Sequence, residues 1–118
     1  MDLYREELMD HYKNPRNYGK IENPTKTIHE SNPLCGDRVD IDVTIKDGVI
    51  SDARFRGDGC AISTAATSLF LEKIQGMRVE DAKKITKEEV LDMINPNLTL
   101  SRIKCAVLGY TALQKLLE

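Results

Sequence analysis

The most constraining feature of the sequence is an alternation of apolar and polar residues on both sides of an Asp-Gly pair. In residues 38–46 every second residue is apolar, which predicts a β-strand with one buried face. A second alternating run, residues 49–56, follows Asp47 and Gly48 directly. Because Asp and Gly are typical of tight turns between strands, the two runs predict a β-hairpin.

Placing both apolar sets on one face of the hairpin defines an expected register. Ile45 would pair with Val49 across a loop of residues 46–48, because a shift by one residue would bring two arginines among the valines. This register places Cys35 opposite the residue that precedes Cys60. Opposed residues of antiparallel strands have Cα atoms ~4.5 to 5.5 Å apart, so we expect the two cysteines to converge at one end of the hairpin.

The remaining patterns predict helices around this hairpin and one further strand. Thr86 and Glu89 have the spacing of a capping box, and Cys60 and Cys105 fall at the starts of two expected helices. The expected helices are residues 2–12, 61–75, 79–85, 90–94 and 102–117, and a weak polar strand is expected at 25–31. We therefore expect an α+β fold, with a small antiparallel three-stranded sheet packed against several helices, in a single domain of residues 1–118.

Composition narrows the class of protein. Seventeen Lys and Arg against nineteen Asp and Glu give a formal net charge of -2, and aromatic residues make up 5 % of the chain. Neither a basic patch nor a stacking platform for nucleic acid is expected. The apolar runs are far shorter than the ~20 residues of a membrane span, and the acidic N-terminus lacks the apolar core of a signal peptide. We therefore expect a cytoplasmic protein that binds neither nucleic acid nor membrane.

The three cysteines are the candidates for chemistry, since an odd number excludes a complete disulfide framework. An unpaired cysteine is often a small buried hydrophobe, and a structural adaptor is the corresponding function. The positions favour reactivity or metal binding instead. Cys60 and Cys105 lie where a helix start favours a thiolate, and Lys104 adds a positive charge beside Cys105.

A zinc or iron-sulfur site requires about four protein ligands, one more than the three cysteines supply. Asp37 is the best further candidate, because it lies two residues after Cys35 on the same strand face; its alternative is a solvated turn carboxylate. A Cys-His nucleophile is less attractive, since no spacing argument brings His11 or His29 to a thiol. The glycines around Cys60 lack the lysine of a phosphate-binding loop.

A set of motifs in order along the chain resembles a known family. The motifs are DHYKNPRNYG (10–19), CGD (35–37), DGVISDARF (47–55), GDGCAIS (57–63) and RIKCA (102–106). Together they resemble the iron-sulfur cluster assembly scaffold family, the class of IscU, SufU and the N-terminal domain of NifU. The resemblance extends over residues 4–117, essentially the whole chain.

This resemblance implies an α+β scaffold on which a cysteine desulfurase delivers sulfur, iron is added, and a transient 2Fe-2S cluster is built for transfer to apoproteins or carriers. Such a protein is a carrier rather than an enzyme. The ligands implied by the resemblance are Cys35, Asp37, Cys60 and Cys105, and zinc can occupy the same site. The resemblance also implies that Cys105 accepts persulfide sulfur, with Lys104 favouring its thiolate.

Two departures from the family pattern bear on partners. The best-known branch has a histidine before its third cysteine and a Pro-Pro-Val-Lys chaperone motif, whereas this chain has Lys104 and no proline pair. Dependence on an Hsp70-type chaperone is therefore not expected. The Arg-Ile-Lys-Cys segment is similar to SufU, which gives the alternative function of a zinc-bound sulfur acceptor that activates a desulfurase. SufU usually carries an insertion between its second and third cysteines, and the separation of 45 positions from Cys60 to Cys105 leaves no obvious room for it. A homodimer is compatible with the family, but no interface pattern predicts one.

Overall fold

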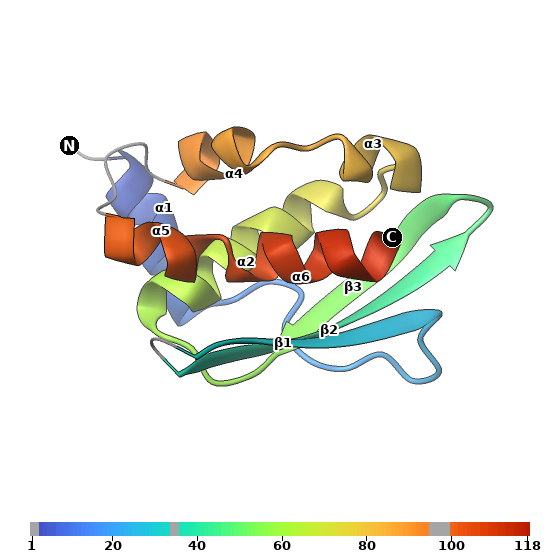
Figure 1. Ribbon diagram of the computed structural model, residues 1–118, viewed down its shortest axis with the longest axis horizontal. Coiled ribbons are helices and arrows are strands. Elements are labelled where there is room, and N and C mark those ends of the chain that lie inside the picture. The colour runs from blue at the N-terminus through green and yellow to red at the C-terminus, as the bar shows by residue number, and fades with distance from the viewer. Residues whose placement is uncertain (1–2, 34–35, 95–99) are drawn as a thin grey trace.

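The chain, seen in a computed structural model, forms a three-stranded antiparallel sheet with helices on one side (Figure 1). The structure describes residues 3–33, 36–94 and 100–118. Strands β1 (Lys26–Asn32), β2 (Asp37–Lys46) and β3 (Val49–Arg56) lie in the order β1-β2-β3. The expected α+β architecture is confirmed, including the weak first strand, whose side chains are all exposed or half-buried.

The turn of the hairpin is shorter than expected. It has two residues, Asp47 and Gly48, with φ of 52° and 77°, and Lys46 pairs with Val49 across it. Two successive residues with positive φ make the tight turn whose twist matches that of the flanking strands. A β-bulge follows, where Ser51 is the extra residue of β3.

This bulge decides which side chains of the hairpin reach the core. Beyond it Ile41 pairs with Phe55. The register expected from pairing Ile45 with Val49 would place Val39 there, so that register is wrong by two residues. Because the bulge adds one residue, Ile50 turns to the core and is fully buried, whereas Val49 is half-buried. A bulge interrupts the alternation on which the expected register depended.

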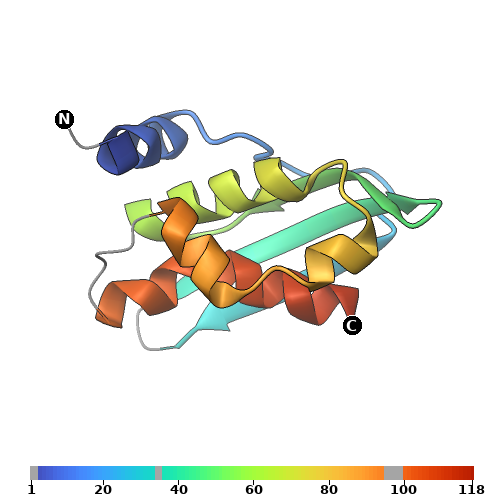
Figure 2. The ribbon, with the colours of Figure 1, turned by 90° about the horizontal axis from the view of Figure 1, so that it is seen from above.

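The described residues form six helices, which pack in two layers (Figures 1 and 2). Helices α2 and α6 contact the sheet, α1 packs beside α2, and α3 and α4 lie over α2 and α6. Their bounds are α1 (Leu3–Lys13), α2 (Ala61–Ile74), α3 (Val79–Lys83), α4 (Lys87–Ile94), α5 (Leu100–Ala106) and α6 (Leu108–Leu117). The single helix expected at 102–117 is divided at Val107. None of these helices has the length and apolar character required to cross a membrane.

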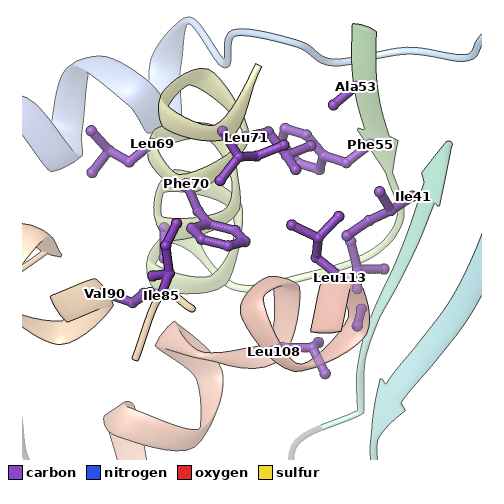
Figure 3. Close-up of a cluster of buried hydrophobic side chains, with 14 of the residues drawn as sticks. Ile41, Ala53, Phe55, Leu69, Phe70, Leu71, Ile85, Val90, Leu108 and Leu113 are labelled. Atoms are coloured by element: carbon purple, nitrogen blue, oxygen red, sulfur yellow. The ribbon is translucent and has the colours of Figure 1, made fainter. Parts of the chain in front are cut away.

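Helix α2 is the centre of the core, because the sheet, α1, α4 and α6 all pack around it. Figure 3 shows Phe70 and Leu71 of α2 pointing toward side chains of α6 and the sheet, among them Leu113 and Phe55. All four are at most 3 % exposed. Covered on several sides, α2 holds its N-terminus in a fixed position relative to the sheet.

A buried polar cluster attaches α1 and the segment after it to α2. Ser68, fully buried on α2, accepts a hydrogen bond from the Arg16 N–H at 2.8 Å, and His11 Nδ1 lies 2.7 Å from the same hydroxyl oxygen. His11 is 4 % exposed. Burial, and then the nearby charge of Arg16, lower the pKa of His11 below its usual value, so this histidine packs as a neutral side chain.

A second buried group, Asp42 of β2, fixes the end of the same segment. Its carboxylate accepts hydrogen bonds from the Ile21 N–H at 3.0 Å, the Thr27 hydroxyl at 2.7 Å and the Arg56 guanidinium at 2.9 Å. Burial acts to raise the pKa of Asp42, but these three hydrogen bonds and the Arg56 charge outweigh it and leave the pKa below its usual value. The segment of residues 14–25 is thereby attached to both α2 and the sheet.

Candidate metal centre

Three side chains with metal-binding atoms converge at one end of the molecule, where the starts of β2 and α2 meet α5 (Figure 1). Asp37 is the first residue of β2, Cys60 is the N-cap of α2, and Cys105 lies in the last turn of α5. A carboxylate oxygen and the two Sγ atoms all lie within 4.8 Å of one another. Two sulfur ligands of one zinc ion, each at ~2.3 Å, are at most ~4.6 Å apart. The three atoms are thus close enough to bind one ion or a compact cluster with little movement.

Close backbone packing after β3 brings Cys60 to this position. Gly57 has φ of 148°, and a Cβ atom on it would lie 2.2 Å from the Arg38 carbonyl oxygen, so only glycine allows the chain to pass this close to β2. The next carbonyl, that of Asp58, accepts a hydrogen bond from the Arg38 N–H at 2.7 Å. These contacts continue the pairing with β2 beyond β3 and place Cys60 beside Asp37.

Asp37 is 6 % exposed, and its two carboxylate oxygens are used differently. Oδ1 accepts a hydrogen bond from the Cys60 N–H at 3.2 Å, whereas Oδ2 is buried and has no hydrogen-bond partner among the described residues. A buried carboxylate oxygen without a partner is costly, and a bound cation offsets that cost. The solvated turn carboxylate considered from the sequence is wrong, and the environment fits a metal ligand.

Cys60 begins α2, as the sequence predicts. Its Sγ accepts a hydrogen bond from the Ser63 N–H at 3.4 Å, and the residue is exposed. The N-terminus of a helix favours negative charge, and the thiolate is the form of cysteine that binds metal. Cys60 is therefore accessible to an ion or a partner from solvent and is not a buried hydrophobe.

Cys105 lies in a different local setting from the expected one. It is half-buried in the last turn of α5 rather than in the first turn of a long helix, so the favourable effect of a helix start does not apply to it. Lys104 precedes it and is exposed. The break at Val107 separates α5, which carries the thiol, from α6, which packs in the core.

The expected convergence of Cys35 with Cys60 falls on a residue outside the described ranges. The register on which that expectation rested is corrected above. Within the described chain, the residues that come together are Asp37, Cys60 and Cys105.

Neither histidine belongs to this group. His11 is buried against Ser68, and His29 is exposed on β1, with its Nδ1 2.6 Å from an Asp40 carboxylate oxygen. The arrangement therefore gives no support to a Cys-His nucleophile among the described side chains. Two sulfur atoms and a carboxylate oxygen form a donor set suited to zinc or iron.

One interaction at the centre has no signal in the sequence, namely the hydrogen bond from the Cys60 N–H to Asp37. It depends on the bulge in β3, which sets where the chain reaches α2. The spacing of the two residues along the chain carries no information on this contact.

Comparison with known proteins gives matches over the full length of the chain. Residues 3–118 match the model of the NifU-like N terminal domain family. The chain is 36 % identical over 130 aligned positions to the zinc-dependent sulfurtransferase SufU of Bacillus subtilis, covering 96 % of this chain and 88 % of that protein. It is 35 % identical over 113 positions to the iron-sulfur cluster assembly scaffold protein IscU 1 of Archaeoglobus fulgidus, covering 96 % of this chain and 73 % of that protein.

Solved structures give the same result. A crystal structure described as a putative iron-sulfur cluster assembly scaffold protein for the SUF system, from Fervidobacterium islandicum, superposes with a TM-score of 0.80 at 28 % identity, covering all of this chain and 96 % of that one. An aligned length of 130 positions with SufU exceeds the 118 residues of this chain, so that alignment contains gaps in this chain. The chain belongs to the family of NifU-like N-terminal domains, the class that includes IscU and SufU.

Proposed function

We propose that this protein is a scaffold on which a transient 2Fe-2S cluster is assembled and then passed to acceptor proteins. The observation that carries the proposal is the gathering of Asp37, Cys60 and Cys105 within 4.8 Å around a buried carboxylate oxygen that lacks a hydrogen bond. Membership in the family supports it, since relatives are named iron-sulfur cluster assembly scaffold proteins. Thiolates are the usual protein ligands of such clusters.

Cys35 is proposed as the remaining ligand, two residues before Asp37 in the sequence. Three thiolates would then hold the iron atoms, together with one carboxylate oxygen. Oxygen ligands are harder than the thiolates that iron-sulfur clusters prefer, so the Asp37 position is the weaker one. This unequal ligand set suits a cluster that must be released.

The proposed partners are a cysteine desulfurase as the source of sulfur and apoproteins or carriers as acceptors. In the transfer step the Cys105 thiolate attacks the outer sulfur of a persulfide on the desulfurase. A sulfur-sulfur bond forms at Cys105, the bond in the donor breaks, and the donor cysteine leaves as a thiolate. In this role the chain is a carrier, and Lys104 stabilises the attacking thiolate of Cys105.

The scaffold role is tested by adding ferric iron and sulfide to the protein without oxygen. The wild type should develop visible charge-transfer absorption with iron and sulfide in equal amounts, and Cys60→Ser should lose most of it. Asp58→Asn is the control, because its carboxylate is 88 % exposed and lies two residues before Cys60. A wild-type protein that takes up no iron and sulfide rejects the scaffold role.

A zinc-bound sulfur acceptor that activates a desulfurase is the second candidate. Two observations favour it: Lys104 stands where the best-known scaffold branch has a histidine, and a relative 36 % identical is named a zinc-dependent sulfurtransferase. The same side chains would hold the zinc ion. In this case zinc-loaded protein increases desulfurase turnover, and Cys105→Ser abolishes the increase. No stimulation, or stimulation that is indifferent to Cys105, rejects it.

A further inference from the structure

The two described thiols of the metal centre are close enough to react with each other as well as with metal. Their Sγ atoms lie within 4.8 Å of one another, although Cys60 and Cys105 belong to different elements and are 45 positions apart. The sulfur atoms of a disulfide are ~2.05 Å apart, so the two must approach by at most about 2.8 Å. Side chains move between staggered rotamers, and such a change at one or both cysteines supplies much of this movement.

The setting of Cys105 in the fold allows the remaining movement. Cys105 lies in the last turn of α5, a helix of seven residues whose contacts among the described elements are mainly with α2, α4 and α6. The break at Val107 follows that turn, so a small shift of α5 leaves the packing of α6 in place. Cys60, by contrast, is fixed at the start of the central helix, where its N–H donates to Asp37.

The two thiols differ in exposure, and this difference assigns them different roles. Cys60 is exposed, and its Sγ accepts a hydrogen bond from the Ser63 N–H at 3.4 Å, whereas Cys105 is half-buried. A hydrogen bond at a helix start favours the thiolate, which is the form that peroxides oxidise. An accessible thiolate beside a second thiol is typical of cysteines that are oxidised reversibly, because the second thiol converts the first oxidation product into a disulfide.

We propose that Cys60 and Cys105 form a peroxide-reactive pair, which an intramolecular disulfide closes when no metal is bound. The Cys60 thiolate attacks one oxygen of hydrogen peroxide, the O–O bond breaks, hydroxide leaves, and Cys60 becomes a sulfenic acid. The Cys105 thiolate then attacks the Cys60 sulfur, an S–S bond forms, the S–O bond breaks, and a second hydroxide leaves. The two thiols lose two electrons, which the peroxide gains, and a dithiol reductant reverses the oxidation by exchange.

This reaction goes beyond the proposed function, because it requires only the two thiols and not a particular metal or cluster. Its consequence falls on the metal centre, since the disulfide removes both sulfur atoms from the group of Asp37, Cys60 and Cys105. Thiolates are the form of cysteine that binds metal. Oxidation therefore abolishes metal binding reversibly, and a bound metal protects the two thiols from peroxide.

Peptide mapping by mass spectrometry tests the pair in metal-free protein treated with hydrogen peroxide and then alkylated. A peptide pair joined through Cys60 and Cys105 should account for most of the oxidised wild type and disappear after reduction with dithiothreitol. Zinc uptake should be lost on oxidation and restored on reduction. With zinc at 100 times the dissociation constant, about 1 % of the sites lack metal, so the disulfide should form ~100-fold more slowly. Asp58→Asn should behave as the wild type in all of these measurements.

Two variants separate the roles of the thiols. In Cys105→Ser the sulfenic acid of Cys60 loses its described neighbouring thiol, so dimedone should label Cys60 during peroxide treatment. In Cys60→Ser the half-buried Cys105 should be labelled less. A wild-type disulfide to Cys35 or between two chains overturns the pairing, labelling of Cys105 in preference to Cys60 overturns the roles, and unchanged zinc uptake after oxidation overturns the effect on the centre. If reduced protein takes up neither zinc nor iron, the proposed function fails, whereas the peptide map still decides the thiol pair.

Discussion

At the scale of single residues, Asp37 connects the folding of the chain to its metal chemistry. Oδ1 is occupied by the Cys60 N–H, which fixes the start of α2 beside β2, and Oδ2 is left buried without a partner. In the absence of a cation this second oxygen is a cost to stability. The side chain is thus suited to bind metal, and it lowers the stability of the protein when no metal is bound.

Substituting Asp37→Asn separates these two roles, since asparagine keeps the Oδ1 acceptor but loses the charge. The metal-free variant should be at least as stable as the metal-free wild type, because an unpaired buried charge is removed. Zinc at 100 times the dissociation constant should stabilise the wild type by about 2.7 kcal/mol, and it should stabilise the variant less. Thermal unfolding with and without zinc measures this. Equal zinc-induced shifts in Tm for the two proteins would count against Asp37 as a ligand, and Asp58→Asn should behave as the wild type.

The buried His11 predicts an acid loss of stability. Its pKa is lowered in the folded state, chiefly by burial, from 6.5. Below pH 6.5 the unfolded chain therefore binds a proton that the folded chain does not. The free energy of unfolding thus decreases as the pH is lowered from 6.5, until the pKa of the folded state is reached. The slope from one proton is at most about 1.4 kcal/mol per pH unit.

His11→Asn should remove this slope, even though it lowers stability at pH 7.5 through the altered contact with Ser68. Urea unfolding at several pH values between 7.5 and 5.5 measures it. His29→Asn keeps the buried histidine and should keep the acid loss. Parallel pH profiles of the wild type and His11→Asn would show that another group is responsible. Asp42 does not interfere, because its pKa is lowered from 3.8 and its contribution is lost only at lower pH.

The sequence identifies the chemistry of the centre more readily than its contacts. Cys60 and Asp37 stand out because thiols and carboxylates are side chains that bind zinc or iron. Their hydrogen bond could not be predicted, because it depends on a two-residue turn and a bulge many residues away. The residue types indicate which chemistry is possible, and the path of the backbone decides which of these groups come into contact.

At the scale of elements, the hairpin and the helices are predictable because apolar residues recur at a different spacing in strands and in helices. The sequence pattern correctly indicates strands before and after Asp47 and Gly48 and a helix after Cys60. It does not indicate the bulge at Ser51 or the break at Val107. The break at Val107 separates two helices with different neighbours, since α6 lies against α2 and the sheet whereas α5 reaches the metal centre.

Gly57 is the backbone position that brings Cys60 to the centre, and Gly19 is a matched control. Both have positive φ, 148° and 139°, but only at Gly57 would a Cβ meet another atom, the Arg38 carbonyl oxygen at 2.2 Å. Each alanine variant carries the strain of its backbone angle. Gly57→Ala should cost a further ~1 to 3 kcal/mol, typical of overpacking, and should weaken zinc binding. Urea unfolding and zinc titration of both variants measure the difference. Equal costs would show that the close approach is unimportant.

Gly109 joins α6 to α2 by another close approach. A Cβ there would lie 2.5 Å from Thr67 Oγ1 and 2.9 Å from its Cγ2, so rotating the threonine exchanges one clash for the other. In an exposed helix, Gly→Ala stabilises by ~1 kcal/mol. Here Gly109→Ala should destabilise by ~1 to 3 kcal/mol, and Thr67→Ala in the same chain should restore part of the loss. A stabilised Gly109→Ala in urea unfolding would contradict the observed packing of α2 and α6.

At the scale of the whole molecule, the candidate ligands belong to three elements that are far apart in the sequence. Asp37 begins a strand, Cys60 begins the central helix, and Cys105 lies in a short helix at the same end (Figure 1). The core holds the first two in place, since β2 and α2 both contribute fully buried side chains to it. A bound metal would therefore join three separate parts of the chain. Helix α5 would gain most, because its contacts among the described elements are mainly with the helices α2, α4 and α6 and not with the sheet.

Hydrogen exchange measured by mass spectrometry, with and without zinc, tests this joining of elements. Local opening that separates α5 from Asp37 and Cys60 must break the metal site, so its free energy rises by the binding free energy. At zinc 100 times the dissociation constant, amides of residues 103–107 and 60–64 should exchange up to ~100-fold more slowly. The β2–β3 turn at Asp47 and Gly48, at the other end of the molecule (Figure 1), should be unchanged. Slowing confined to residues 60–64 would show that Cys105 is not bound, and uniform slowing would show that zinc only shifts global unfolding.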